Sequence, residues 1–150
     1  MFEQQVEHYK KKYYGIKNSL ENRSIEPYLK NWGITDLKDS LLSNSKEFRD
    51  FAYDIARSVM PGRVSCTTYA AVISYIADLV GVDVKAFAGF CLPKSHPKYE
   101  TELSFFNAKK TEGVKHPLMA THVYVEINGN SYEYYNGDTS NIAHIDCVEI

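Results

Sequence analysis

Cys66 is the residue whose position most directly suggests chemistry, because it opens a segment predicted to be a buried helix over 66–80. The first N–H groups of a helix have no partner within the helix, and the helix dipole adds positive charge at the same end. Both effects favour thiolate over thiol, which lowers the pKa of a cysteine and makes its sulfur nucleophilic. The position alone also fits a small apolar residue that fills space in the core.

His122 is the second candidate. It lies on the clearest predicted strand, 119–127, where apolar residues alternate with His122, Tyr124 and Glu126 on the opposite face. A histidine within hydrogen-bond reach of a cysteine takes the thiol proton and activates the sulfur. Taken alone, His122 also fits a structural role.

Asn136 and Asp138 are candidates for a third group that would hold the imidazole of His122 in one tautomer. Both follow closely on a strand predicted over 131–136, which returns beside the histidine strand after an Asn-Gly hairpin signal. The Asn-Gly-Asp run that contains them is equally typical of a simple turn.

The length of the hairpin loop decides which of these side chains faces the histidine. With a two-residue loop, Ile127 pairs with Asn130, and Asn136 points to the opposite side of the sheet from His122. With a three-residue loop, Ile127 pairs with Ser131, and Asn136 lies opposite His122. Three-residue loops with Asn in the left-handed region are common, so we predict this second register.

Cys91 and Cys147 lack the helix-start position of Cys66, and we expect both to be reduced and dispensable for chemistry. Three cysteines, an odd number, argue against a disulfide framework and favour a reducing cytoplasm. The cysteines also lack the short paired spacing of a zinc site, and the sequence has no glycine-rich phosphate loop. We therefore expect neither a metal nor a cofactor.

The composition narrows the possible partners. A formal net charge of −2 offers no basic face for nucleic acid. No apolar run approaches the ~18 residues that span a membrane, and the N-terminus lacks a signal-peptide pattern. We expect a protein or peptide substrate, no nucleic acid and no membrane, while the sequence leaves the oligomeric state open.

The remaining pattern predicts the frame that positions these groups. Residues 1–60 are predicted to be helical, with a convincing helix that starts at Ser45 and stops before Pro61-Gly62. The part from 62 to 150 is predicted to hold the buried helix, a mostly antiparallel sheet and a long polar loop over 92–117. The sheet strands are expected over 84–91, 119–127, 131–136 and 144–150. Together these elements predict one domain, 1–150, of the α+β class.

Four short motifs, in this order, resemble the transglutaminase-like branch of the papain-like cysteine enzymes over roughly residues 62–140. The resemblance implies Cys66 as nucleophile, His122 as base and Asn136 as the orienting group. Asn136 stands where the family usually has Asp, and no side chain matches an oxyanion donor. Tyr124 and Tyr132 stand where the family usually has Trp. The motifs are Cys66-Thr67-Thr68-Tyr69-Ala70-Ala71, Gly81-Val82-Asp83-Val84, His122-Val123-Tyr124-Val125-Glu126-Ile127 and Tyr132-Glu133-Tyr134-Tyr135-Asn136.

The resemblance implies a cysteine-dependent acyl-transfer enzyme that acts on amide bonds of a protein or peptide through a Cys66 thioester. Peptidase, deamidase and transglutaminase activities share these steps and differ in the acceptor that resolves the thioester. Two other functions stay open: a catalytically silent binding module of the same fold, and an acyl transferase similar to the arylamine acetyltransferases.

Overall fold

The structure is a computed structural model that describes residues 2–62, 64–94, 100–101, 104, 120–134 and 142–150. The regular elements of this part are five helices and a four-stranded antiparallel sheet, so the fold is of the α+β class, as predicted. In chain order they are α1 (Phe2–Leu20), α2 (Glu26–Trp32), α3 (Leu37–Ser43), α4 (Lys46–Val59), α5 (Cys66–Leu79), β1 (Lys85–Pro93), β2 (Ala120–Ile127), β3 (Asn130–Tyr132) and β4 (Ile142–Glu149).

Short polar side chains fix where three of the helices begin. The Asp36 carboxylate accepts a hydrogen bond from the backbone of α3, and the Ser45 hydroxyl does the same at the start of α4. Ser65 caps α5, with its Oγ accepting from the Thr68 N–H at 3.1 Å. Gly33, at φ 66°, ends α2 in the left-handed region. The predicted start of the cysteine helix is therefore confirmed.

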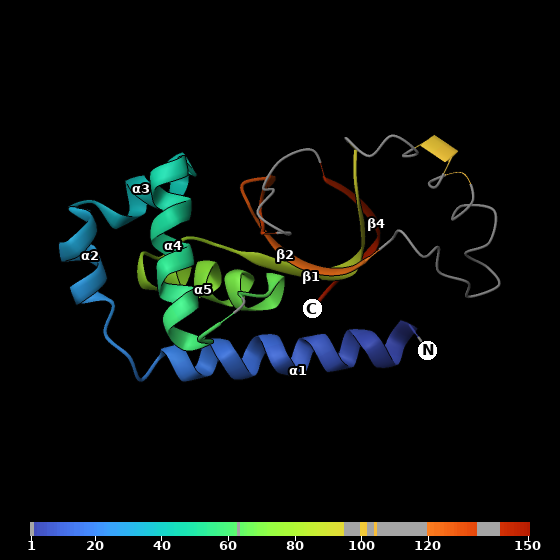
Figure 1. The fold of residues 1–150 in the computed structure, drawn as a ribbon, viewed down its shortest axis with the longest axis horizontal. Coiled ribbons are helices and arrows are strands. Elements are labelled where there is room, and N and C mark those ends of the chain that lie inside the picture. The colour runs from blue at the N-terminus through green and yellow to red at the C-terminus, as the bar shows by residue number, and fades with distance from the viewer. Residues whose placement is uncertain (1, 63, 95–99, 102–103, 105–119, 135–141) are drawn as a thin grey trace.

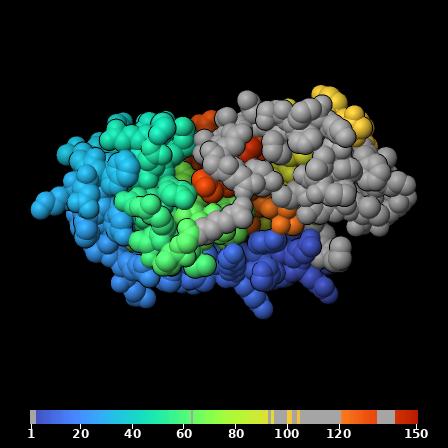
Figure 2. Space-filling view, in the orientation of Figure 1, coloured from blue at the N-terminus to red at the C-terminus, as the bar shows by residue number. Residues whose placement is uncertain are grey.

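Helix α5 is the centre of the molecule. All of its residues from Thr67 to Ala77 are buried, and it packs against α1, α4 and β2. Figure 1 shows α2, α3 and α4 at one end, the sheet at the other, and α1 running along both. The same arrangement is visible from outside in Figure 2, where the helices cover one end and the lower side. No described helix is long and apolar enough to cross a membrane.

The sheet has the strand order β3-β2-β1-β4, which makes β4 an edge strand as predicted. The register predicted for the hairpin is wrong, because Ile127 pairs with Asn130 and the loop has two residues. Asn128 and Gly129 have φ values of 53° and 79°. A tight two-residue turn of this kind needs positive φ at both positions, and an Asn-Gly pair tolerates it well. The structural reason for placing Asn136 opposite His122 is thereby removed.

The returning strand is also shorter than predicted, since β3 ends at Tyr132 rather than at 136. Residues 135–141, which include Asn136 and Asp138, lie outside the described residues, as does most of the predicted 92–117 loop. β4 spans Ile142–Glu149, close to the predicted 144–150.

A β-bulge interrupts the pairing of β1 with β4. Ala88 pairs with Val148 and Phe90 pairs with Ile145, so two residues of β4 lie opposite the single Gly89. Asp146, one of the two, has a φ of 49°. The bulge shifts the register by one residue, which changes the face on which all earlier β4 side chains lie.

Candidate active site

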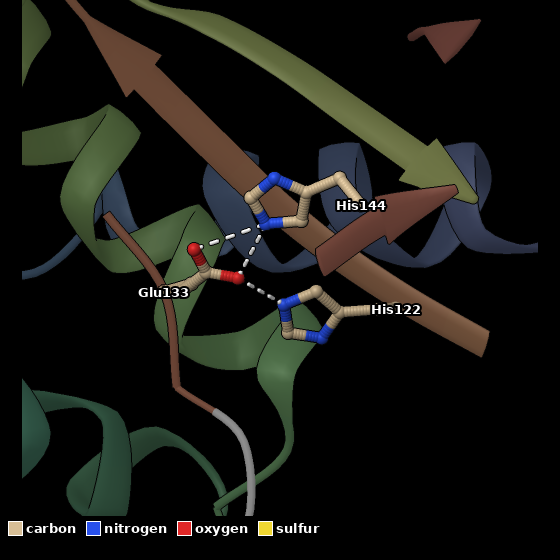
Figure 3. A group of neighbouring side chains, drawn as sticks. All are labelled: His122, Glu133 and His144. Atoms are coloured by element: carbon tan, nitrogen blue, oxygen red, sulfur yellow. Dashed lines mark hydrogen bonds and ion pairs between the residues drawn. The ribbon is translucent and has the colours of Figure 1, made fainter. Parts of the chain in front are cut away.

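His122 lies on β2 and is buried, with 1% of its surface exposed. Its Nε2 lies 2.7 Å from Oε1 of Glu133, a buried residue that directly follows β3 (Figure 3). An ionised carboxylate only accepts hydrogen bonds, so Nε2 carries the hydrogen and donates it. Continuing the observed hairpin register brings Glu133 opposite Tyr124, and therefore onto the same face as His122.

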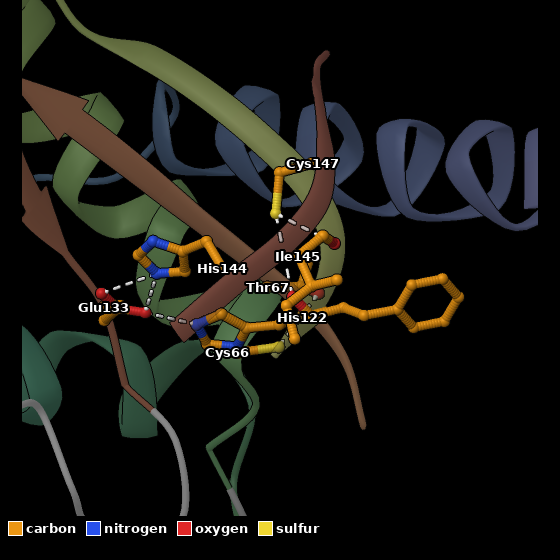
Figure 4. Close-up of polar contacts among 8 residues, drawn as sticks. Cys66, Thr67, His122, Glu133, His144, Ile145 and Cys147 are labelled. Carbon is orange, nitrogen blue, oxygen red and sulfur yellow. Dashed lines mark hydrogen bonds and ion pairs between the residues drawn. The ribbon is translucent and has the colours of Figure 1, made fainter. Parts of the chain in front are cut away.

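Cys66 is the first residue of α5 and lies at the edge of β2 that β3 leaves uncovered. Because β3 stops after three residues, the N–H of Val123 is available to the Cys66 sulfur, to which it donates a hydrogen bond. The Cys66 side chain also interacts with the imidazole of His122, and this contact affects the pKa of both groups. Figure 4 shows the sulfur beside the ring nitrogen that does not face Glu133. The imidazole thus lies between a thiol and a carboxylate.

This arrangement favours a charged thiolate–imidazolium pair. Burial raises the pKa of the Cys66 thiol, but the contact with His122, the positive charge of that ring and the Val123 N–H together lower it below its ordinary value. Burial lowers the pKa of His122, whereas the contacts with Cys66 and Glu133 raise it to about 9. The proton therefore prefers the imidazole to the sulfur.

Glu133 is shared between two histidines. His144 on β4 places its Nε2 at 2.8 Å from Oε1 and at 3.0 Å from Oε2 of Glu133. Burial raises the pKa of Glu133, but the hydrogen bonds from His122 and His144 lower it below the ordinary range. The carboxylate is therefore ionised and held from two strands.

The bulge at Gly89 is what puts His144 on this face. In the observed register His144 pairs with Cys91, which lies on the same face of β1 as Gly89, the partner of His122. If the register set by the Ala88–Val148 pair continued without a bulge, His144 would pair with Leu92 and its side chain would point to the opposite face.

Tyr124 contacts both His144 and a second thiol, that of Cys147. Its ring stacks on His144 with centroids 3.8 Å apart, and on Phe87 with centroids 5.3 Å apart. Its hydroxyl is hydrogen bonded to Cys147. Burial raises the pKa of the Cys147 thiol, and the hydrogen bonds to it offset this only in part. Cys147 is therefore a poor nucleophile compared with Cys66.

The start of α5 offers backbone donors close to the sulfur. The Ser65 side chain takes the Thr68 N–H and the Ser65 carbonyl takes the Tyr69 N–H. This cap does not use the N–H groups of Cys66 and Thr67, the first two of the helix. Such N–H groups suit an oxyanion that develops beside the nucleophile.

Of the residues predicted from the sequence, Cys66 and His122 are brought together by the structure, although they are far apart in the chain. Asn136 and Asp138 lie outside the described residues. Glu133, which holds His122 in the structure, is not among the predicted residues. The signal that points to it is the two-residue loop, which places Glu133 on the face of His122.

Comparison with known proteins found no family model, no curated protein and no solved structure that matches the chain.

Proposed function

We propose that the protein is a cysteine-dependent acyl-transfer enzyme of the transglutaminase-like or papain-like kind, with Cys66 as nucleophile, His122 as general base and Glu133 as the orienting group. One observation carries the proposal. A cysteine at a helix N-terminus lies beside one ring nitrogen of a buried histidine (Figure 4), and the second nitrogen of this histidine lies 2.7 Å from a carboxylate. A nucleophile, a base and a third group that orients the base are the arrangement that acyl transfer requires.

The first half of the reaction uses the charge pair. The thiol proton passes to His122, and the Cys66 thiolate attacks the carbonyl carbon of an amide, forming a carbon–sulfur bond. The negative charge moves to the carbonyl oxygen, where the N–H groups of Cys66 and Thr67 at the start of α5 stabilise it. Glu133 keeps the hydrogen of His122 on Nε2 and directs the other nitrogen towards the sulfur.

The second half returns the proton. The imidazolium of His122 protonates the leaving amine or ammonia as the carbon–nitrogen bond breaks, which leaves a thioester on Cys66. Water or a primary amine then attacks the thioester, with His122 as base, and the thiol is regenerated. The proposed substrate is a protein or peptide, because the chemistry acts on amide bonds.

We place the protein in the cytoplasm as part of the same proposal. The chemistry needs Cys66 in its thiol form, and none of the described cysteines Cys66, Cys91 and Cys147 forms a disulfide. A reducing compartment preserves such thiols.

Trapping the acyl-enzyme tests the proposal. The protein is incubated with p-nitrophenyl acetate, and peptide mass spectrometry locates the acetyl group. We expect a burst of p-nitrophenol and one acetyl group on Cys66, released faster when a primary amine is added. A glutamine-containing peptide with a fluorescent amine then distinguishes transamidation from hydrolysis.

Two variants control this experiment. His122→Ala should slow acylation at pH 7 by about a hundredfold or more, the lower end of a typical general-base contribution. Cys147→Ala removes the other partly exposed thiol and should leave the burst unchanged. Acetylation of Cys147 in preference to Cys66, or the same burst in His122→Ala, would contradict the proposal.

A further inference from the structure

The side chains of His122, Glu133 and His144 direct three potential ligand atoms at one point. One ring nitrogen of each histidine and one carboxylate oxygen of Glu133 lie within 4.8 Å of one another (Figure 3). Both nitrogens approach the same oxygen, Oε1, at 2.7 and 2.8 Å. We infer that these three residues form a binding site for a divalent zinc ion, separate from the Cys66 sulfur.

The ligand types select the metal. Two imidazoles and one carboxylate suit zinc, whereas magnesium and calcium prefer sites made of oxygen atoms. Three protein ligands also leave a fourth tetrahedral position for water. At zinc–ligand distances of about 2.0–2.2 Å the ligand atoms would lie roughly 3.3 Å apart, so this site must open by about half an ångström.

His144 is the side chain that allows this opening. It belongs to the edge strand β4, and its side chain is 21% exposed, whereas those of His122 and Glu133 are 0% and 6% exposed. Burial of the other two ligands fixes their positions, because His122 is packed on β2 and stacked near Tyr124. A metal therefore approaches from the His144 side.

The thiol lies on the other side of the ring. Glu133 and His144 face Nε2 of His122, whereas Cys66 lies beside the second ring nitrogen (Figure 4). A metal on Nε2 thus takes no ligand from Cys66. It would replace the Nε2 hydrogen and keep a hydrogen on the other nitrogen, so zinc would stop His122 from accepting the thiol proton. This last consequence rests on the proposed function; the site itself does not.

Calorimetric titration of Cys66→Ala protein with zinc chloride tests the site without its thiol. We expect one zinc ion to bind per chain, and added magnesium should not reduce zinc binding. In the same background, His144→Gln and Glu133→Gln should each weaken zinc binding at least tenfold. This is the lower end of the loss in metal affinity that usually follows when a residue supporting the metal is replaced. His8→Gln, on the exposed face of α1, is the matched control and should bind like its parent.

The unaltered protein gives a second measurement that needs no variant. X-ray absorption of its zinc complex should show nitrogen and oxygen ligands only, and the cobalt complex should lack a sulfur-to-metal charge-transfer band. Loss of binding in Cys66→Ala, sulfur in the absorption spectrum, full binding in His144→Gln, or no binding at all would each overturn the inference. Acylation of Cys66 is measured with EDTA present, which keeps zinc off the protein. A failure of acylation therefore contradicts the proposed function and leaves the zinc site untouched, whereas a failure of zinc binding contradicts only the zinc site.

Discussion

The charge on the Cys66 sulfur depends on a single imidazole. Burial works against the thiolate, and the contact with His122 and the positive charge of its ring are the main effects that lower the pKa of the thiol. The pKa of His122 is raised to about 9 by the same contact and by Glu133. Between these two pKa values the site holds one proton, on the ring.

The pH dependence of Cys66 alkylation follows from this. With iodoacetamide and EDTA, the wild-type rate should reach its plateau below the ordinary thiol pKa of ~8.5 and change again near 9, as His122 loses its proton. In His122→Ala the sulfur stays buried without its partner, so the midpoint should move to or above ~8.5. At pH 7 the variant should react about tenfold more slowly, and above about pH 9.5 the two rates should converge. A rate ratio that is constant with pH would mean that His122 acts only through the fold.

Glu133 should act on the sulfur through the ring. Glu133→Gln keeps the shape and one hydrogen-bond acceptor but removes the charge, so the pKa of His122 falls and that of Cys66 rises. We expect the alkylation midpoint to move up by about one pH unit, since charge-assisted hydrogen bonds are roughly twice as strong as neutral ones. Glu126→Gln, on the same face of β2, makes the same charge change away from the ring and is the control. An equal shift in both variants would assign the effect to overall charge rather than to the 2.7 Å contact.

At the scale of elements, Gly89 lies where two residues of β4 face one residue of β1. A Cβ added to Gly89 would lie 2.5 Å from the Cys147 sulfur and 2.7 Å from the Cys147 Cα. Backbone must therefore move, and Gly89→Ala should destabilise the protein by about 1–3 kcal/mol, the usual range for overpacking. Urea denaturation followed by circular dichroism measures the change.

Gly15 provides the matched control within α1. A Cβ there meets nothing within 4 Å, so Gly15→Ala should stabilise the protein by about 0.5–1 kcal/mol. If Gly89→Ala were equally stabilising, the bulge would not need a glycine, and the position of His144 would have another cause.

Local signals in the sequence predict the helices well, including the position of Cys66 at the start of one of them. Ser45, Ser65 and Gly33 act on neighbouring backbone groups, so their effect is readable within a few residues. The hairpin register is different, because an Asn-Gly pair is compatible with both loop lengths and the energy difference between them is small. One residue of register decides whether Glu133 or Asn136 shares the face of His122.

The features that complete the site depend on contacts far apart in the chain. The short β3 exposes the Val123 N–H to Cys66, and the bulge opposite Gly89 turns His144 inward. Neither has a local signature, because a bulge is set by how β1 and β4 pack together. The sequence therefore predicts that Cys66 and His122 lie together, but it does not predict Glu133 and His144 on the other side of the His122 ring.

At the scale of the molecule, α1 connects the two ends. Its Tyr13 hydroxyl donates to Ser74 of α5 at 2.6 Å in the core, and its Lys17 pairs with Asp78 of the same helix at 2.9 Å. Nearer its N-terminus, the Tyr9 hydroxyl lies 2.7 Å from that of Thr121 on β2. Helix α1 thus binds both the central helix and the sheet, and residues 1–60 share one core with the site.

A shared core predicts that both ends unfold together. Trp32, the single tryptophan, reports on the helical end, where its Nε1 donates to Asp54 of α4 at 3.1 Å. Cys91, fully buried in β1, reports on the sheet once Cys66 and Cys147 are replaced by Ala. Because α5 packs against helices and sheet alike, we expect tryptophan fluorescence and thiol labelling to give the same urea midpoint in this variant. A fluorescence transition at clearly lower urea than the exposure of Cys91 would divide the chain into two units, and the single-domain prediction would be wrong.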